Sequence, residues 1–106
     1  MPNYKLRYFF DAGSGICLWS ANDSAREKFG YPIDVSQLNL DENTKRKAYY
    51  LLAWYDTCIN WNSPADPCSW STEDRARFKC EAENLYKLLS IELGSEFEIV
   101  DELKPV

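Results

Sequence analysis

The sequence of 106 residues contains no histidine. Imidazole is the most common general base in enzymes and the usual activator of serine and cysteine nucleophiles. Its absence excludes Ser-His and Cys-His catalytic pairs, and it also excludes mixed Cys/His zinc sites. The glycine motifs that bind nucleotide phosphates and dinucleotides are missing too. We therefore expect no catalytic residue, no metal site and no cofactor, and we predict that the protein is not an enzyme.

Long apolar runs are also absent, since none approaches the ~20 residues that a membrane-spanning helix needs. Near the N-terminus the apolar residues are interrupted by Lys5 and Arg7. A secretion signal, by contrast, requires a continuous apolar region. We therefore expect a cytoplasmic protein with no membrane anchor.

No two cysteines have the Cys-x-x-Cys spacing of zinc knuckles and redox motifs. The four cysteines are Cys17, Cys58, Cys68 and Cys80. Because apolar residues make up 45% of the chain, a core can form without covalent cross-links, and no export signal points to an oxidising compartment. We expect buried, reduced cysteines, with disulfide pairing as the less favoured alternative.

Lysine and arginine are missing from two long stretches of this chain, whose formal net charge is -5. Residues 48–74 contain four acids and no base, and residues 88–103 contain five acids and no base. A surface of this sign repels phosphate backbones and anionic lipids, so we expect neither a nucleic-acid nor a membrane partner. It would instead attract a basic protein. The alternative is a solvated acidic surface that only increases solubility.

The apolar pattern predicts an α+β fold in a single domain, residues 1–106. Period-two alternation over residues 4–10, a glycine-rich turn at 11–15 and an apolar run at 16–20 predict an N-terminal β-hairpin. Alternation returns over residues 96–100 and predicts a C-terminal strand.

Three helices are predicted between these strands, over residues 22–29, 42–59 and 72–93. The last has the clearest limits, because Ser71 is a suitable N-cap and Gly94 a suitable C-terminal stop. The expected packing is a small, mostly antiparallel sheet with helices on one face.

Tryptophan is concentrated in the first stretch without bases, where Trp61 and Trp70 flank a proline-containing loop. Aromatic side chains among acids are typical of interfaces that bind cationic proteins. The alternative is that the rings clamp the loop to the rest of the protein, and this packing role is the stronger of the two for Trp70. The residues that we predict to contact a partner are Asp56, Trp61, Asp66, Trp70, Glu73 and Asp74.

The stretches Phe10–Asn22 and Phe29–Pro32 are similar to a pattern in small, stand-alone bacterial proteins. In size, acidity and lack of catalytic motifs, the whole chain resembles immunity proteins of bacterial toxin–immunity systems, including contact-dependent growth inhibition. The resemblance implies a protein-binding inhibitor whose acidic surface occludes the active site of a basic toxin, such as a nuclease. Two alternatives stay open: a small enzyme whose carboxylates are paired by folding, and a self-associating structural protein.

Overall fold

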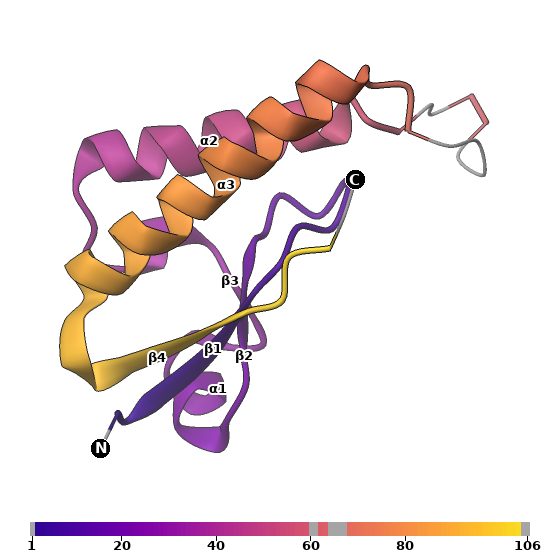
Figure 1. Ribbon diagram of the computed structural model, residues 1–106. Coiled ribbons are helices and arrows are strands. Elements are labelled where there is room, and N and C mark those ends of the chain that lie inside the picture. The colour runs from indigo at the N-terminus through magenta and orange to yellow at the C-terminus, as the bar shows by residue number, and fades with distance from the viewer. Residues whose placement is uncertain (1, 60–61, 64–67, 105–106) are drawn as a thin grey trace.

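The computed structural model describes residues 2–59, 62–63 and 68–104 and confirms the predicted α+β class (Figure 1). Its main elements are β1 (Tyr4–Tyr8), β2 (Leu18–Ser20), α1 (Asp23–Phe29), β3 (Pro32–Ile33), α2 (Glu42–Asp56), α3 (Thr72–Leu93) and β4 (Phe97–Asp101). Two 3-10 turns, η1 (Val35–Gln37) and η2 (Gly94–Glu96), precede α2 and β4. Within the described residues, no helix has the length and apolar character needed to cross a membrane.

The strands form one mixed sheet in the order β3-β2-β1-β4. β1 and β2 make the predicted antiparallel hairpin, with Leu6 opposite Ser20, and β2 also pairs antiparallel with β3. β4 lies parallel to β1, with Leu6 opposite Ile99. A parallel neighbour requires a long connection, which α2 and α3 provide. The short edge strand β3 was not predicted, because Pro32 reads as a turn residue and is tolerated in a sheet only at an edge.

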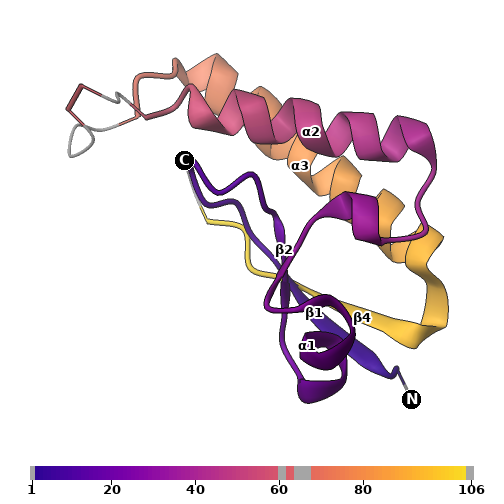
Figure 2. The same ribbon diagram turned by 180° about the vertical axis from the view of Figure 1, so that it is seen from behind.

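Helices α2 and α3 lie side by side over one face of the sheet (Figures 1 and 2). Tyr8 of β1 is fully buried beneath α3, and its hydroxyl donates a hydrogen bond of 2.9 Å to the carbonyl of Ala82. Leu51 of α2 and Leu85 of α3 are also fully buried. Because side chains alternate along a strand, the neighbouring Arg7 lies on the other face of the sheet.

Local capping sets the limits of α3, and the predicted range of residues 72–93 is confirmed. The Ser71 hydroxyl accepts a hydrogen bond of 3.1 Å from the amide of Asp74. At the other end Gly94 has φ 77°, a left-handed conformation that glycine adopts without steric cost.

Helix α2 ends at Asp56, earlier than the predicted residue 59. The Thr57 hydroxyl donates to the carbonyl of Trp54 at 2.6 Å, and the amide of Cys58 donates to the carbonyl of Tyr55 at 3.0 Å. These shorter-range bonds tighten the last turn and redirect the chain toward α3.

The expectation of reduced, buried cysteines is wrong for most of them. Cys58 and Cys68 form a disulfide, with their Cα atoms 4.7 Å apart. Cys80 is free but exposed, and only Cys17 is both free and buried. Because α2 and α3 pack antiparallel, Cys58 after α2 lies close to Cys68 before α3. This proximity cannot be deduced from composition.

Candidate protein-binding surface

One end of the molecule joins segments that are far apart in the sequence. Figures 1 and 2 show the β1–β2 turn at the same end as the last turn of α2 and the first turn of α3. The amide of Gly13 in that turn donates a hydrogen bond of 2.9 Å to Oδ1 of Asp56. Trp70 connects the two helices, because its Nε1 donates to Oγ1 of Thr57 at 2.9 Å. We call the carboxylates at this end the acidic end: Asp11, Asp56, Glu73 and Asp74.

Asp56 occupies an unusual position for an acid, because it is the last residue of α2. The C-terminus of a helix carries partial negative charge, so a carboxylate there costs about 0.3–1 kcal/mol. The hydrogen bond from Gly13 offsets part of this cost. Gly13 has φ 83°, and this left-handed conformation belongs to the tight turn that carries its amide to Asp56.

Asp11 and Asp56 both lie close enough to Tyr55 for their charges to act on its hydroxyl. The pKa of the Tyr55 hydroxyl is raised, first by burial and then by the negative charges of Asp11 and Asp56. Asp11 was not among the predicted contact residues, although it is the first residue of the predicted turn at 11–15 and is exposed in the structure. The fold therefore adds a carboxylate from the hairpin to those predicted from residues 56–74.

Glu73 and Asp74 lie in the first turn of α3, where the positive end of the helix dipole stabilises carboxylates. Glu73 is exposed and Asp74 is half-buried. None of the ion pairs found among the described residues includes Asp11, Asp56, Glu73 or Asp74. The acidic end therefore keeps its negative charge.

Trp70 is buried, with 9% of its surface exposed. Its ring packs against Trp54, Tyr55 and Phe78, with centroids 5.0 to 6.4 Å apart. This burial supports the packing role weighed for Trp70 and leaves little ring surface for a partner. The other two predicted contact residues of the loop, Trp61 and Asp66, lie outside the described residues.

A groove of mixed charge borders the acidic end on one side. It has a volume of about 510 Å³ and runs between α3 and the end of β4, and its charged lining is Arg75, Lys79, Glu83, Asp101 and Lys104. Arg75 is tied to the backbone, because its guanidinium donates to the carbonyl of Cys68 at 2.9 Å and to that of Trp70 at 3.3 Å. It therefore stabilises the start of α3 and does not form an ion pair with the acids described above.

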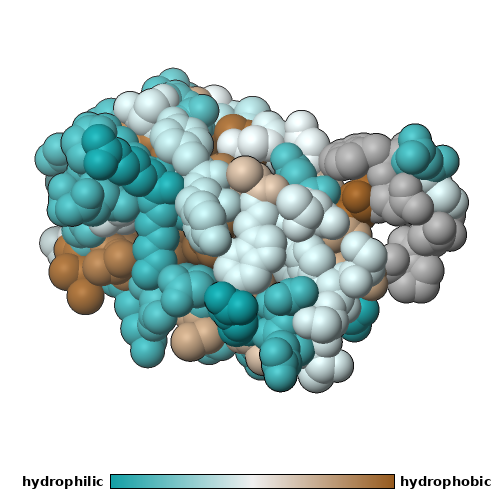
Figure 3. All heavy atoms as spheres, turned by 90° about the horizontal axis from the view of Figure 1, so that it is seen from above, coloured by the Kyte–Doolittle hydropathy of each residue, from teal (hydrophilic) through white to brown (hydrophobic). Residues whose placement is uncertain are grey.

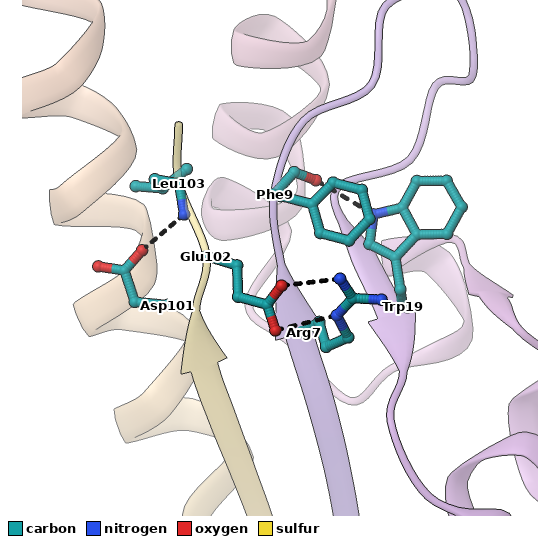
Figure 4. A network of polar contacts seen from close by, with 6 residues as sticks. All are labelled: Arg7, Phe9, Trp19, Asp101, Glu102 and Leu103. Carbon is teal, nitrogen blue, oxygen red and sulfur yellow. Dashed lines mark hydrogen bonds and ion pairs between the residues drawn. The ribbon is translucent and has the colours of Figure 1, made fainter. Parts of the chain in front are cut away.

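The second acidic stretch, residues 88–103, is neutralised in part by β1. Glu102 accepts two hydrogen bonds from Arg7, of 2.8 and 2.9 Å (Figure 4), and Glu98 lies 3.5 Å from Lys5. The hydrogen bond with Arg7 holds the pKa of Glu102 below its usual value. This compensation was missed from the sequence, because β1 and β4 are at opposite ends of the chain.

The face over α2 and α3 has a different character (Figure 3). Its surface is mainly hydrophilic to intermediate, and the hydrophobic residues form small, separate groups. Ile91, with 76% of its surface exposed, is the most exposed large apolar side chain among the described residues. Interfaces between identical subunits usually need a more continuous apolar patch, so this face does not favour self-association.

Similarity to known proteins extends over the whole fold and is not limited to this surface. The family model described as Serratia CdiI immunity protein-like matches residues 4–101. The match begins in β1 and ends at the last residue of β4, so it includes every helix and strand of the fold. A search of curated proteins gave no match.

Proposed function

The chain belongs to the Serratia CdiI immunity protein-like family, and from this membership we propose that it protects its host cell by binding a toxin of a contact-dependent growth inhibition system. Inhibition follows from occlusion of the toxin active site and requires no reaction by the immunity protein. The absence of histidine from the sequence is consistent with a role in binding.

The toxin-binding surface in this proposal is the acidic end. The observation that carries it is the contrast between two groups of acids. Glu98 and Glu102 are paired with Lys5 and Arg7, whereas Asp56 and its neighbours at the acidic end form no ion pair among the described residues. Uncompensated negative charge on one surface attracts a basic partner and accelerates its association.

The predicted contact residues take different parts in this proposal. Asp56, Glu73 and Asp74 face the toxin together with Asp11, and Trp61 and Asp66 remain proposed contacts of the same region. Trp70 acts indirectly, because its buried ring fixes the end of α2 against the start of α3.

Coexpression with the toxin tests this function. A toxin domain of a contact-dependent growth inhibition system, sought in the reading frame next to that of this chain, is expressed in a sensitive host, with and without the immunity protein, and growth is measured. We expect the native chain to restore growth and the double variant Asp56→Lys/Glu73→Lys to fail while remaining folded. Glu27→Lys, compared with each single variant, Asp56→Lys and Glu73→Lys, is the matched control, because Glu27 is an exposed acid on α1, at the other end of the molecule. Equal protection by these variants and by Glu27→Lys would place the interface elsewhere.

A further inference from the structure

The Cys58–Cys68 disulfide lies next to the acidic end, at the base of the connection between α2 and α3. It closes a loop between cysteines that are separated by 10 positions in the sequence. Cys58 is buried, with 5% of its surface exposed, and belongs to the same core cluster as Trp70 and Phe78. Cys68 is only partly buried, so its side of the disulfide is the one that an external reagent can approach.

Each half of the disulfide is linked by short contacts to one helix end. Thr57, the residue before Cys58, accepts the indole hydrogen bond of Trp70. The carbonyl of Cys68 accepts the 2.9 Å hydrogen bond from Arg75 in the first turn of α3. In the sequence, Asp56 comes directly before Thr57, and Glu73 lies between Cys68 and Arg75. The cross-link therefore supports the spacing between the two carboxylates that we assign to toxin binding.

We propose that the Cys58–Cys68 disulfide is a reversible redox clip that controls the toxin-binding surface. This inference rests on the proposed function of the acidic end. In the oxidised form the ends of α2 and α3 are covalently tied, so the carboxylates are ordered before the toxin arrives. In the reduced form only the non-covalent contacts hold the two helix ends and they open more often, so part of the ordering must take place on binding.

The clip opens by thiol–disulfide exchange with a dithiol reductant. One thiolate of the reductant attacks Sγ of Cys68, the Cys58–Cys68 bond breaks, and the electron pair leaves with Sγ of Cys58, which takes up a proton. The second thiolate of the reductant then attacks the reductant sulfur that is bonded to Sγ of Cys68 in the mixed disulfide. Cys68 is released and takes up a proton, and the reductant becomes an intramolecular disulfide. Two electrons have passed to the protein.

The two free cysteines differ in their capacity to interfere with this exchange. Burial raises the pKa of Cys17 to about 12, so this thiol stays protonated and is shielded from reagents. Cys80 is exposed on α3, and replacing it removes the accessible free thiol without touching the clip. Cys80→Ser is therefore the control for Cys58→Ser/Cys68→Ser.

The first experiment follows the clip in the full-length chain without the toxin. The protein is equilibrated in glutathione buffers of graded redox ratio, alkylated and weighed by mass spectrometry, and amide hydrogen exchange is recorded for both forms. We expect reversible conversion between disulfide and dithiol. We also expect faster exchange after reduction at Ser69, Asp74 and Gly13, whose amides are bonded within or next to the clipped region. A pair that never oxidises in these buffers, or exchange that does not change, overturns the clip.

The second experiment measures association of each form with the toxin domain used in the growth test. We expect reduced protein and Cys58→Ser/Cys68→Ser to bind roughly tenfold more weakly than oxidised protein, because rotamer-rich side chains are ordered on binding. Cys80→Ser should retain both the full affinity and its loss on reduction. Equal affinity of the oxidised and reduced forms overturns the inference and leaves the proposed function intact. Binding by neither form overturns the proposed function itself, and the regulatory role falls with it.

Discussion

The amide of Gly13 donates a hydrogen bond of 2.9 Å to Oδ1 of Asp56 and thereby joins the β1–β2 turn to the last residue of α2. The contact places a carboxylate where the helix dipole disfavours it. It also holds this carboxylate against the turn that contains Asp11, whose charge acts on the same Tyr55 hydroxyl, so two segments that are distant in sequence contribute to one charged surface.

Asp56→Asn is expected to separate stability from binding. The amide oxygen of asparagine can still accept from Gly13, and removing the charge relieves the dipole cost of about 0.3–1 kcal/mol while weakening the hydrogen bond by a comparable amount. The free energy of unfolding, measured with urea, should therefore change by less than about 1 kcal/mol. Association with the toxin should slow in stopped-flow experiments. A strongly destabilised variant with unchanged association would assign Asp56 a purely structural role.

Salt should weaken the complex through its association rate. If the acidic end steers a basic toxin, raising the salt concentration from about 0.05 to 0.5 M should slow association by roughly tenfold and change dissociation less. Glu73→Gln should make association both slower and less sensitive to salt. Glu27→Gln, which removes an equal charge from α1, should leave the salt dependence near that of the native chain. If Glu73→Gln and Glu27→Gln showed the same dependence of association rate on salt, this would argue against steering by Glu73.

Trp70 is expected to contribute mainly to stability. Trp70→Ala removes a buried aromatic ring and should cost about 3–5 kcal/mol of unfolding free energy. Trp70→Phe keeps a ring in the cluster but loses the hydrogen bond to Thr57, which should reduce the cost to about 1–3 kcal/mol. Ile91→Ala is the control for a large apolar side chain that is exposed, and should change stability by less than about 0.5 kcal/mol. A Trp70→Phe variant of native stability that no longer binds the toxin would instead make Trp70 a contact residue.

The accuracy of the sequence predictions depended on how local each signal was. The limits of α3 were predicted because Ser71 and Gly94 act on neighbouring backbone groups. The hairpin and the alternation of β1 were predicted for the same reason. The parallel pairing of β4 with β1 was not predicted, because the local sequence of a strand does not determine which distant strand it pairs with.

The candidate surface was likewise predicted only where the signal is local in the sequence. The acids of residues 56–74 were found as a stretch without bases, but the hairpin residue Asp11 joins them only through the folded contact between Gly13 and Asp56. The stretch 88–103 is also acidic and free of bases, and only the register of β1 and β4 reveals that Lys5 and Arg7 compensate two of its acids, Glu98 and Glu102. The Cys58–Cys68 disulfide was also missed, because cysteine spacing does not report the distance between two helix ends.

The Arg7–Glu102 pair predicts how stability depends on pH. Its hydrogen bonds hold the pKa of Glu102 below the ordinary value of 4.5 in the folded protein, whereas the unfolded chain keeps the ordinary value. Above that value both states are ionised and the contribution of the pair is fully present. As the pH falls below it, the unfolded state binds the proton first, so the contribution is lost progressively until the folded-state pKa is passed.

Glu102→Gln tests this dependence, because glutamine cannot titrate but keeps an acceptor for Arg7. The native chain should lose more stability than Glu102→Gln between neutral pH and about pH 3, measured as the change in urea midpoint at constant ionic strength. Glu83→Gln is the matched control: Glu83 is an exposed glutamate that is in no ion pair among the described residues, so its variant should follow the native chain. The pair is part exposed, so solvent screening makes the expected difference modest and high salt should reduce it further. Identical acid sensitivity of the native chain and Glu102→Gln would show that the contact with Arg7 does not stabilise the ionised carboxylate in solution.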